Sequence, residues 1–117
     1  MSRLDIETLQ AQLLQFAEER DWAQYHSPKN LSMALAAEAG ELLEVFQWLT
    51  ESSSCDPDPS TRQRAGEELA DVFLYTLLLS QRLDIDLLQA ARSKLAANAQ
   101  KYPADKVRGS ARKYTEY

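Results

Sequence analysis

The amino-acid sequence predicts an all-α protein, and three observations support that fold class. Only 3 glycines and 4 prolines occur among 117 residues, so few positions interrupt a helix. Leu, Ala, Gln and Glu, which favour helices, are abundant. Apolar residues also recur at helical spacing in four long segments. We therefore expect a four-helix bundle that forms one domain over residues 1–117, with a flexible basic tail at residues 103–117.

The first two predicted helices flank an aromatic, irregular segment. The first helix runs from about Leu4 to Arg20. Ser27 and Pro28 then provide an N-cap and a proline for the start of a second helix, which we expect to reach about Glu51. The apolar face of the first helix consists of Leu9, Leu13, Phe16 and Ala17.

The polar stretch SSSCDPDPS at residues 52–60 predicts a loop, because its two prolines exclude helix. Ser60 is a candidate cap for a third helix that ends near Leu83. Residues 72–79 of that helix, VFLYTLLL, are apolar almost all round, and such a helix is normally buried on every side. One chain of this size cannot surround it, so we expect the bundle to be completed by homo-oligomerisation. A fourth helix is expected from about Asp86 to Lys101, before the tail.

Cysteine content and hydropathy bear on the compartment. Cys55 is the single cysteine, so no intramolecular disulfide can form, and a reducing cytoplasm is the simplest location. No apolar run is long enough to span a membrane, and the N-terminus lacks the apolar core of a signal peptide. We therefore expect a soluble cytoplasmic protein without a membrane partner.

Charge is distributed unevenly along the chain. Residues 1–91 contain 16 acidic and 6 basic residues, whereas residues 92–117 contain 2 acidic and 7 basic residues. The basic end could bind nucleic acid, be merely solvated, or hold phosphate groups. Because the acidic body would repel a duplex, no nucleic-acid partner is expected.

Four carboxylates form two pairs at i, i+3 spacing, Glu38 with Glu41 and Glu68 with Asp71. On a helix this spacing places both side chains on one face. At 100° per residue, Glu38 falls within the apolar stripe of the second helix and Glu68 borders that of the third, whereas Glu67 points away. Charge in such positions requires a partner.

Crowded carboxylates either take up protons or are neutralised by a cation. Oxygen ligands favour Mg²⁺ or Mn²⁺ over zinc, and Mg²⁺ commonly completes its shell with substrate phosphates. The four carboxylates therefore predict a metal site for phosphate chemistry. Solvated carboxylates, or carboxylates paired with Lys and Arg, are the alternative.

Candidate phosphate and base ligands accompany the acidic pairs. Lys94, Asn98 and Lys101 follow one another at i, i+4 and i+7, which makes one stripe of donors on the fourth helix, although a wet surface gives the same pattern. Arg108, Arg112 and Lys113 could add to it from the tail.

Aromatic side chains could supply flat surfaces for a nucleobase. Trp48 follows Glu41 by seven residues, close to two helical turns. Core packing is the alternative for any one of these residues alone. The candidates are Trp22, Tyr25, His26 and Trp48.

These motifs together resemble the all-α MazG-like nucleoside triphosphate pyrophosphohydrolases. The strings FAEERDW, HSPKNL, EAGELLEVFQW, EELADVFLY and KYP followed by RGSARKYTE are similar to the dCTP pyrophosphatase branch. The resemblance implies Mg²⁺-dependent cleavage between the α and β phosphates of a nucleoside triphosphate, which gives the monophosphate and pyrophosphate. It further implies dCTP or a modified dCTP as substrate, a role in nucleotide-pool sanitation, and a homotetramer built as a dimer of dimers.

The resemblance also implies roles for individual residues. Glu38, Glu41, Glu68 and Asp71 would be catalytic metal ligands, with Glu38 a candidate to orient or deprotonate the attacking water. Some members of the branch have a histidine in the first helix where this chain has Leu13, so base preference is left open. Substrate-binding residues would be Trp22, His26, Asn30, Trp48, Tyr75, Lys94, Asn98, Lys101, Tyr102, Arg108 and Lys113.

A second hypothesis of another class is a helical oligomer that binds a nucleotide or a protein partner without turnover. Such a protein would keep the apolar third helix but would not need both carboxylate pairs, so the pairs favour the enzyme.

Overall fold

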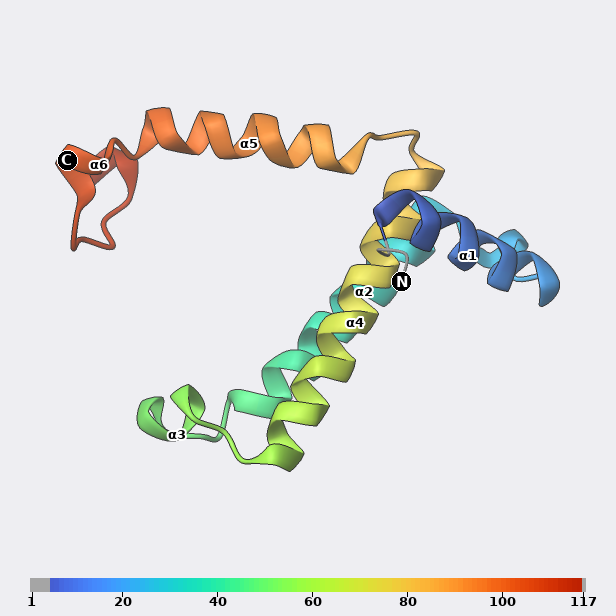
Figure 1. Cartoon of the computed structure of the whole chain (residues 1–117), viewed down its shortest axis with the longest axis horizontal. Helices are drawn as coiled ribbons and strands as arrows, with labels where there is room; N and C mark the ends of the chain where they lie inside the picture. Colours follow the sequence, from blue (N-terminus) through green and yellow to red (C-terminus); the bar gives the residue numbers. More distant parts are fainter. Residues whose placement is uncertain (1–4, 117) are drawn as a thin grey trace. The chain divides into compact units, whose positions relative to one another are not determined.

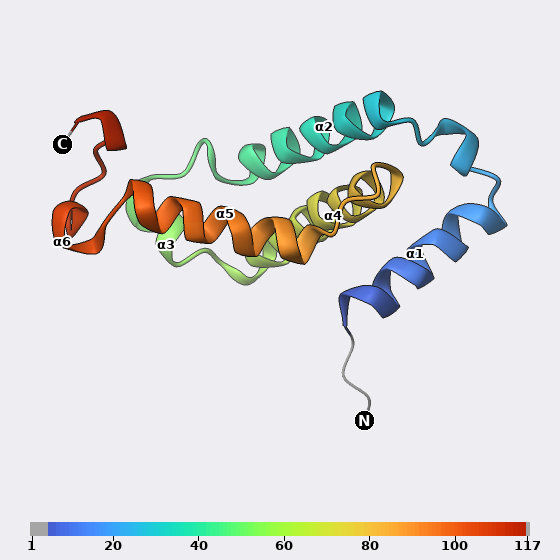
Figure 2. The same cartoon turned by 90° about the horizontal axis from the view of Figure 1, so that it is seen from above.

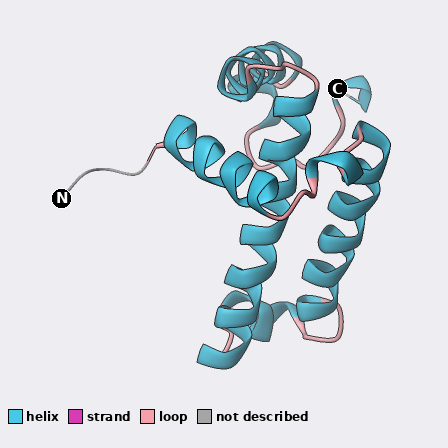
Figure 3. Ribbon diagram, turned by 90° about the vertical axis from the view of Figure 1, so that its right-hand side faces the viewer, coloured by secondary structure: helices cyan, strands magenta, loops and turns pink. Residues whose placement is uncertain are grey.

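The computed structural model describes residues 5–116, and within this range every regular element is a helix (Figure 3). The all-α prediction is confirmed. The elements are α1 (Ile6–Glu19), η1 (Ala23–Tyr25), α2 (Pro28–Phe46), α3 (Glu51–Cys55), α4 (Pro59–Arg82), α5 (Leu87–Lys101), α6 (Ala104–Val107) and η2 (Tyr114–Glu116), where η denotes a 3₁₀ helix.

The chain divides into two compact units, the first ending at Asp84 and the second beginning at Ile85. In the first unit α2 and α4 run antiparallel and side by side (Figures 1 and 2), and α1 packs on α4. The four predicted long helices are therefore present, although Leu4, the expected start of the first, lies outside the described residues.

The core of the first unit lies where α1 and α2 meet α4. On α2, Leu31 and Val45 are buried. Their burial removes apolar surface from water, which stabilises the helix pair. The buried apolar side chains of the described residues are Ala17, Leu31, Val45, Ala65, Leu77 and Leu78.

Side-chain caps determine where the long helices begin. Ser27 Oγ accepts a hydrogen bond of 3.1 Å from the backbone N–H of Asn30, with Pro28 at the first helical position, as predicted. At α4 the cap is Asp58 rather than Ser60, because Asp58 Oδ1 accepts from the N–H of Thr61 at 2.7 Å.

The region between α2 and α4 differs from its prediction. The second helix ends at Phe46, not near Glu51, and part of the expected loop forms α3. Thr50 Oγ1 accepts from the N–H of Ser53 at 3.1 Å, and Ser53 Oγ accepts from the N–H of Thr50 at 3.0 Å. This reciprocal capping box stabilises one new helical turn, and the prolines after Cys55 prevent its continuation.

The apolar segment of α4 is only partly buried within one chain. Leu77 and Leu78 are buried, but 40% of Phe73 and 55% of nearby Leu69 remain exposed. Burial on every side, as the segment predicts, is therefore not reached by a single copy.

The second unit contains α5, α6 and η2. Asp86 Oδ1 caps α5 by accepting from the N–H of Gln89 at 3.1 Å. The tail contains α6 and η2, so part of it is helical, and its flexibility stays a prediction. Among the described helices, none combines the length and apolar character that membrane spanning requires.

Candidate active site

Three of the four predicted carboxylates meet between α2 and α4. Glu38 and Glu41 extend from α2 and Glu68 from α4, and one carboxylate oxygen of each lies within 4.8 Å of the other two. The i, i+3 spacing on α2 and the antiparallel course of α4 produce this grouping. We call Glu38, Glu41 and Glu68 the acidic cluster. Glu67, next to Glu68, is exposed, in agreement with the sequence prediction.

The cluster carries an electrostatic cost. Burial, together with the neighbouring Glu41 and Glu68 carboxyls, raises the pKa of Glu38 to about 7. Burial is also the main cause that raises the pKa of Glu68, followed by its interaction with Glu41. Among the described residues, Glu38 Oε2 and Glu68 Oε2 are buried without a hydrogen-bond partner. Polar atoms buried in this way are uncommon and require a ligand or a proton.

The cluster fits a hard divalent cation. It offers only oxygen donors, and two of these donors are buried and unpaired. One carboxylate oxygen from each of the three residues lies within 4.8 Å of the other two, so together they could hold one shared divalent cation. Carboxylates without Cys or His favour Mg²⁺ or Mn²⁺ over zinc.

Asp71 connects the acidic cluster to a neighbouring pocket. Its charge contributes to the raised pKa values of Glu38 and Glu68, and its side chain lines a pocket of about 230 Å³. We call this pocket the aromatic pocket. It is lined by Leu13, Phe16 and Ala17 of α1, by Trp22 and His26 of the connection to α2, and by Asp71, Leu74, Tyr75 and Leu78 of α4.

The structure brings three of the predicted substrate-binding residues, Trp22, His26 and Tyr75, together in the aromatic pocket. Their binding of a base stays a prediction. Sequence reasoning did not identify Leu74 and Leu78 as pocket residues. They follow Asp71 by three and seven positions, so the helical spacing that pairs Glu68 with Asp71 could have identified them.

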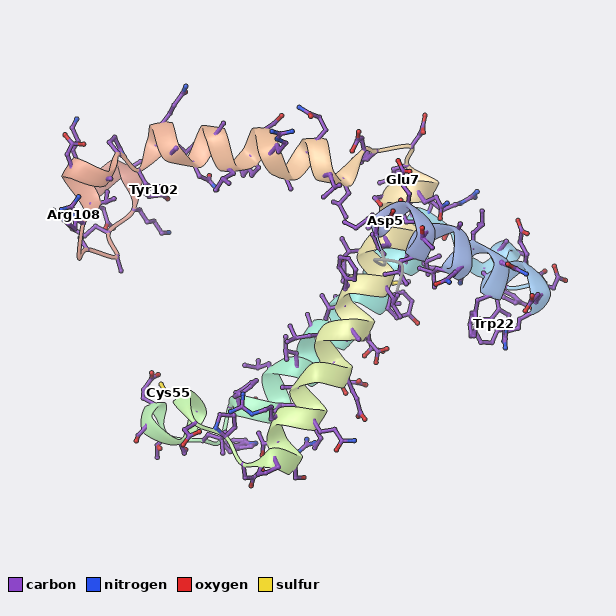
Figure 4. The ribbon with its side chains drawn as sticks, viewed as in Figure 1. Asp5, Glu7, Trp22, Cys55, Tyr102 and Arg108 are labelled. Atoms are coloured by element: carbon purple, nitrogen blue, oxygen red, sulfur yellow. The ribbon has the colours of Figure 1, made fainter. Side chains whose placement is uncertain are left out.

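The C-terminus of α1 orients Trp22. The N–H of Trp22 donates to Ala17 O at 2.9 Å, and the N–H of Asp21 donates to Glu18 O at 3.1 Å, with Asp21 at a left-handed φ of 54°. This is the Schellman arrangement of a helix end. Its accompanying apolar contact is made by Phe16, whose ring meets that of Trp22 edge-on at 5.7 Å. Figure 4 labels Trp22 just beyond α1.

Trp48 and Asn30 have other surroundings. Because α2 ends at Phe46, Trp48 lies beyond the helix, and the helical spacing from Glu41 does not place the two side chains on one face. The side chain of Trp48 is 87% exposed and does not line the aromatic pocket. Asn30 Nδ2 donates to Tyr25 O at 3.0 Å, so its amide stabilises the connection between α1 and α2.

The remaining predicted substrate ligands belong to the second unit. α5 carries Lys94, Asn98 and Lys101, and Asn98 O accepts from the N–H of Tyr102 at 2.8 Å. Figure 4 labels Tyr102 and Arg108. The N–H of Lys113 donates to Glu116 Oε2 at 3.0 Å. Their part in substrate binding stays a prediction.

Comparison with known proteins gives matches over most of the chain. The model of the MazG-like family matches residues 33–117. The chain is 47% identical to human dCTP pyrophosphatase 1 over 114 residues and 45% identical to the bovine protein of that name, in each case over 96% of this chain. It spans 65% of the human protein and 66% of the bovine one. Among solved structures, a pyrophosphatase from Archaeoglobus fulgidus is similar with a TM-score of 0.80 and 34% identity, covering 88% of this chain and 96% of that one.

Proposed function

The chain belongs to the MazG-like family, and from this premise we propose that it is a nucleoside triphosphate pyrophosphohydrolase. The product pair would be a nucleoside monophosphate and pyrophosphate. The observation that carries the proposal is the group of three carboxylates, Glu38, Glu41 and Glu68, whose neighbour Asp71 lines the aromatic pocket. A site of this composition suits a triphosphate whose base enters the pocket. The names of the mammalian relatives make dCTP or a modified dCTP the first candidate substrate.

The four carboxylates would hold one or more Mg²⁺ ions, with Mn²⁺ as a substitute. When bound, Mg²⁺ neutralises charge on the phosphate oxygens. Glu38 is the candidate to orient the attacking water or to take its proton, because its carboxylate lies within the acidic cluster. The water oxygen would attack the α phosphorus, the bond from that phosphorus to the bridging oxygen would break, and pyrophosphate would leave.

The base and sugar would lie in the aromatic pocket. Trp22 and Tyr75 present ring surfaces, and His26 offers the pocket a side chain that can both donate and accept a hydrogen bond. Leu13 contributes an apolar wall in place of a hydrogen-bonding group. Base preference therefore depends more on stacking and shape than on contacts from α1.

The phosphates would be held by cationic and amide groups of the second unit, with Tyr102 beside them. Their support is the excess of basic over acidic residues after position 91 and the donor stripe on α5. They could serve their own chain or another copy. The proposed residues are Lys94, Asn98, Lys101, Tyr102, Arg108 and Lys113.

We also propose that the chain is a homo-oligomer, as a tetramer of paired dimers. Leu43 on α2 and Leu69 and Phe73 on α4 are exposed large apolar side chains in a single copy. A second copy would remove them from water and could bring the exposed Trp48 to a site of its partner. Sedimentation over a range of protein concentrations measures this, and a monomer at all concentrations would contradict it.

The remaining predictions concern organisation and location. We propose one functional domain over residues 1–117, acting in the cytoplasm, for which the single cysteine is the support. Neither nucleic acid nor membrane is proposed as a partner, because the acidic body disfavours polyanions.

A panel of nucleoside triphosphates with Mg²⁺ tests the reaction. We expect equal amounts of monophosphate and pyrophosphate, with the highest kcat/KM for dCTP or a modified dCTP. Orthophosphate as the first product would exclude the mechanism. Binding of a nucleotide with no turnover would favour the non-catalytic oligomer instead.

Adjacent glutamates provide a matched pair of variants. Glu68→Gln removes a carboxylate of the acidic cluster, whereas Glu67→Gln changes the exposed neighbour on the same helix. We expect Glu68→Gln to lower kcat roughly 10²- to 10⁴-fold and Glu67→Gln to leave it within about twofold. Similar activity in both variants would remove Glu68 from the site.

A further inference from the structure

The connection between α1 and α2, residues 21–27, carries two lining residues of the aromatic pocket, Trp22 and His26. Two side chains from elsewhere in the first unit bond to its backbone. Arg82 Nε donates to His26 O at 3.0 Å, and Asn30 Nδ2 donates to Tyr25 O at 3.0 Å. The Arg82 bond joins residues separated by 56 positions in the sequence, so it is a tertiary bond between this connection and α4.

Arg82 connects the two sides of the aromatic pocket that belong to α4 and to residues 21–27. It follows Tyr75 by seven residues, close to two helical turns, so the two side chains leave α4 on nearly the same side. Tyr75 and Asp71 form the α4 wall of the pocket, while His26 belongs to the wall on the connection. A bond from the end of α4 to the carbonyl of His26 therefore holds one wall at a fixed distance from the other.

The bond is exposed to solvent, but it involves a charged donor. A guanidinium donor to a carbonyl is charge-assisted, and a charge in the last turn of α4 interacts favourably with the carbonyl end of the helix. Trp22 does not depend on it for its rotamer, because the end of α1 already orients that ring. His26 has no comparable local support for its carbonyl in the described bonds.

We infer that Arg82 is a positioning residue for the aromatic pocket: through its bond to His26 O it sets the distance between the connection and α4, and so tunes substrate affinity without touching the substrate. The inference rests on the proposed function only in treating the pocket as the place where the base binds.

The test uses Arg82→Met, which keeps an unbranched side chain and removes the donor, with Arg62→Met as the matched control. Arg62 is exposed at the other end of α4, where its side chain forms a 3.9 Å ion pair with Asp56. For the full-length protein and its preferred triphosphate we expect Arg82→Met to raise KM about tenfold while kcat stays within about twofold. Arg82→Lys, which keeps a cationic donor, should recover part of that loss, and Arg62→Met should match the unmodified chain.

His26 supplies a readout that does not need activity. It is the single histidine, so its imidazole proton resonances can be followed without assignment of other histidines. We expect Arg82→Met to move the His26 resonance toward that of an unstructured peptide, and Arg62→Met to leave it in place. If Arg82→Met does not fold, Arg82→Lys and Arg82→Gln are compared in the same two measurements.

An unchanged KM in a folded Arg82 variant overturns the inference, whatever the resonance does. If the unmodified chain hydrolyses no triphosphate, the proposed function fails, and the His26 resonance alone decides: a shift in the Arg82 variant supports the positioning role, and an unchanged line overturns it.

Discussion

The acidic cluster and the aromatic pocket are neighbours, connected by Asp71, but they differ in how their polar groups are satisfied. In the cluster, carboxylate oxygens of Glu38 and Glu68 are buried without partners, so the chain alone leaves it unsatisfied. At the pocket, the backbone groups that present Trp22 and His26 are bonded to Ala17 and Arg82. We therefore expect a ligand to complete the cluster, whereas the pocket is formed by the chain itself.

Mg²⁺ should therefore stabilise the folded chain through the cluster and not through the pocket. At a concentration about 100 times its Kd, a cation that binds only the folded state adds about 2.7 kcal/mol. We expect Glu41→Gln to lose most of this gain and Glu44→Gln, exposed one turn later on α2, to keep it. Thermal unfolding with Mg²⁺ and with chelator measures the gain. An equal gain in both variants would place the cation elsewhere.

Without metal, the cluster should also make stability depend on pH. Glutamate has a pKa near 4.5 when unfolded, and burial raises that of Glu38 to about 7 and also raises that of Glu68. Between these values the folded chain binds more protons than the unfolded chain, so its free energy of unfolding should fall as pH rises from about 4.5 to 7. The N-cap carboxyls of Asp5 and Asp58 have lowered pKa values and act below this window.

Denaturant unfolding in chelator at several pH values measures this slope. Glu38→Gln has no proton to lose, so its curve should be flatter than that of the unmodified chain, while Glu44→Gln should follow the unmodified curve. A metal-free chain whose stability rises across the window would contradict the electrostatic account of the cluster.

Loss of an aromatic ring from the pocket should lower substrate affinity. Trp22→Leu removes a ring that lines the pocket, and Tyr25→Leu removes a 61% exposed ring of the same connection that does not. Because stacking on a base is worth about 1–3 kcal/mol, we expect the KM of Trp22→Leu to rise about tenfold and that of Tyr25→Leu to change little. Initial rates over a range of substrate concentrations measure both, and equal effects would remove Trp22 from base binding.

The contrast between the two sites also explains what the sequence could reveal. Helical periodicity identified the four long helices and the facing carboxylates, because one helix pair positions Glu38, Glu41 and Glu68. It could not identify the bond between Arg82 and His26, which depends on tertiary packing. It missed α3 because the Thr50–Ser53 capping box outweighs the polar composition of the segment.

The sequence also did not predict the left-handed residue that ends α1 before Trp22. Glycine or asparagine usually marks such a helix end, and this chain has Asp21 there. Asp84 has the same φ of 54° after α4, which supplies a matched left-handed residue at the end of another helix. A β-branched residue is strained in this conformation. We expect Asp21→Val and Asp84→Val each to lower the free energy of unfolding by about 1–2 kcal/mol. Only Asp21→Val should also reduce the near-ultraviolet circular dichroism of Trp22, measured with Trp48→Phe in the background. Loss of that signal in the Asp84 variant as well would mean that Trp22 is oriented by the packing of the whole unit rather than by the end of α1.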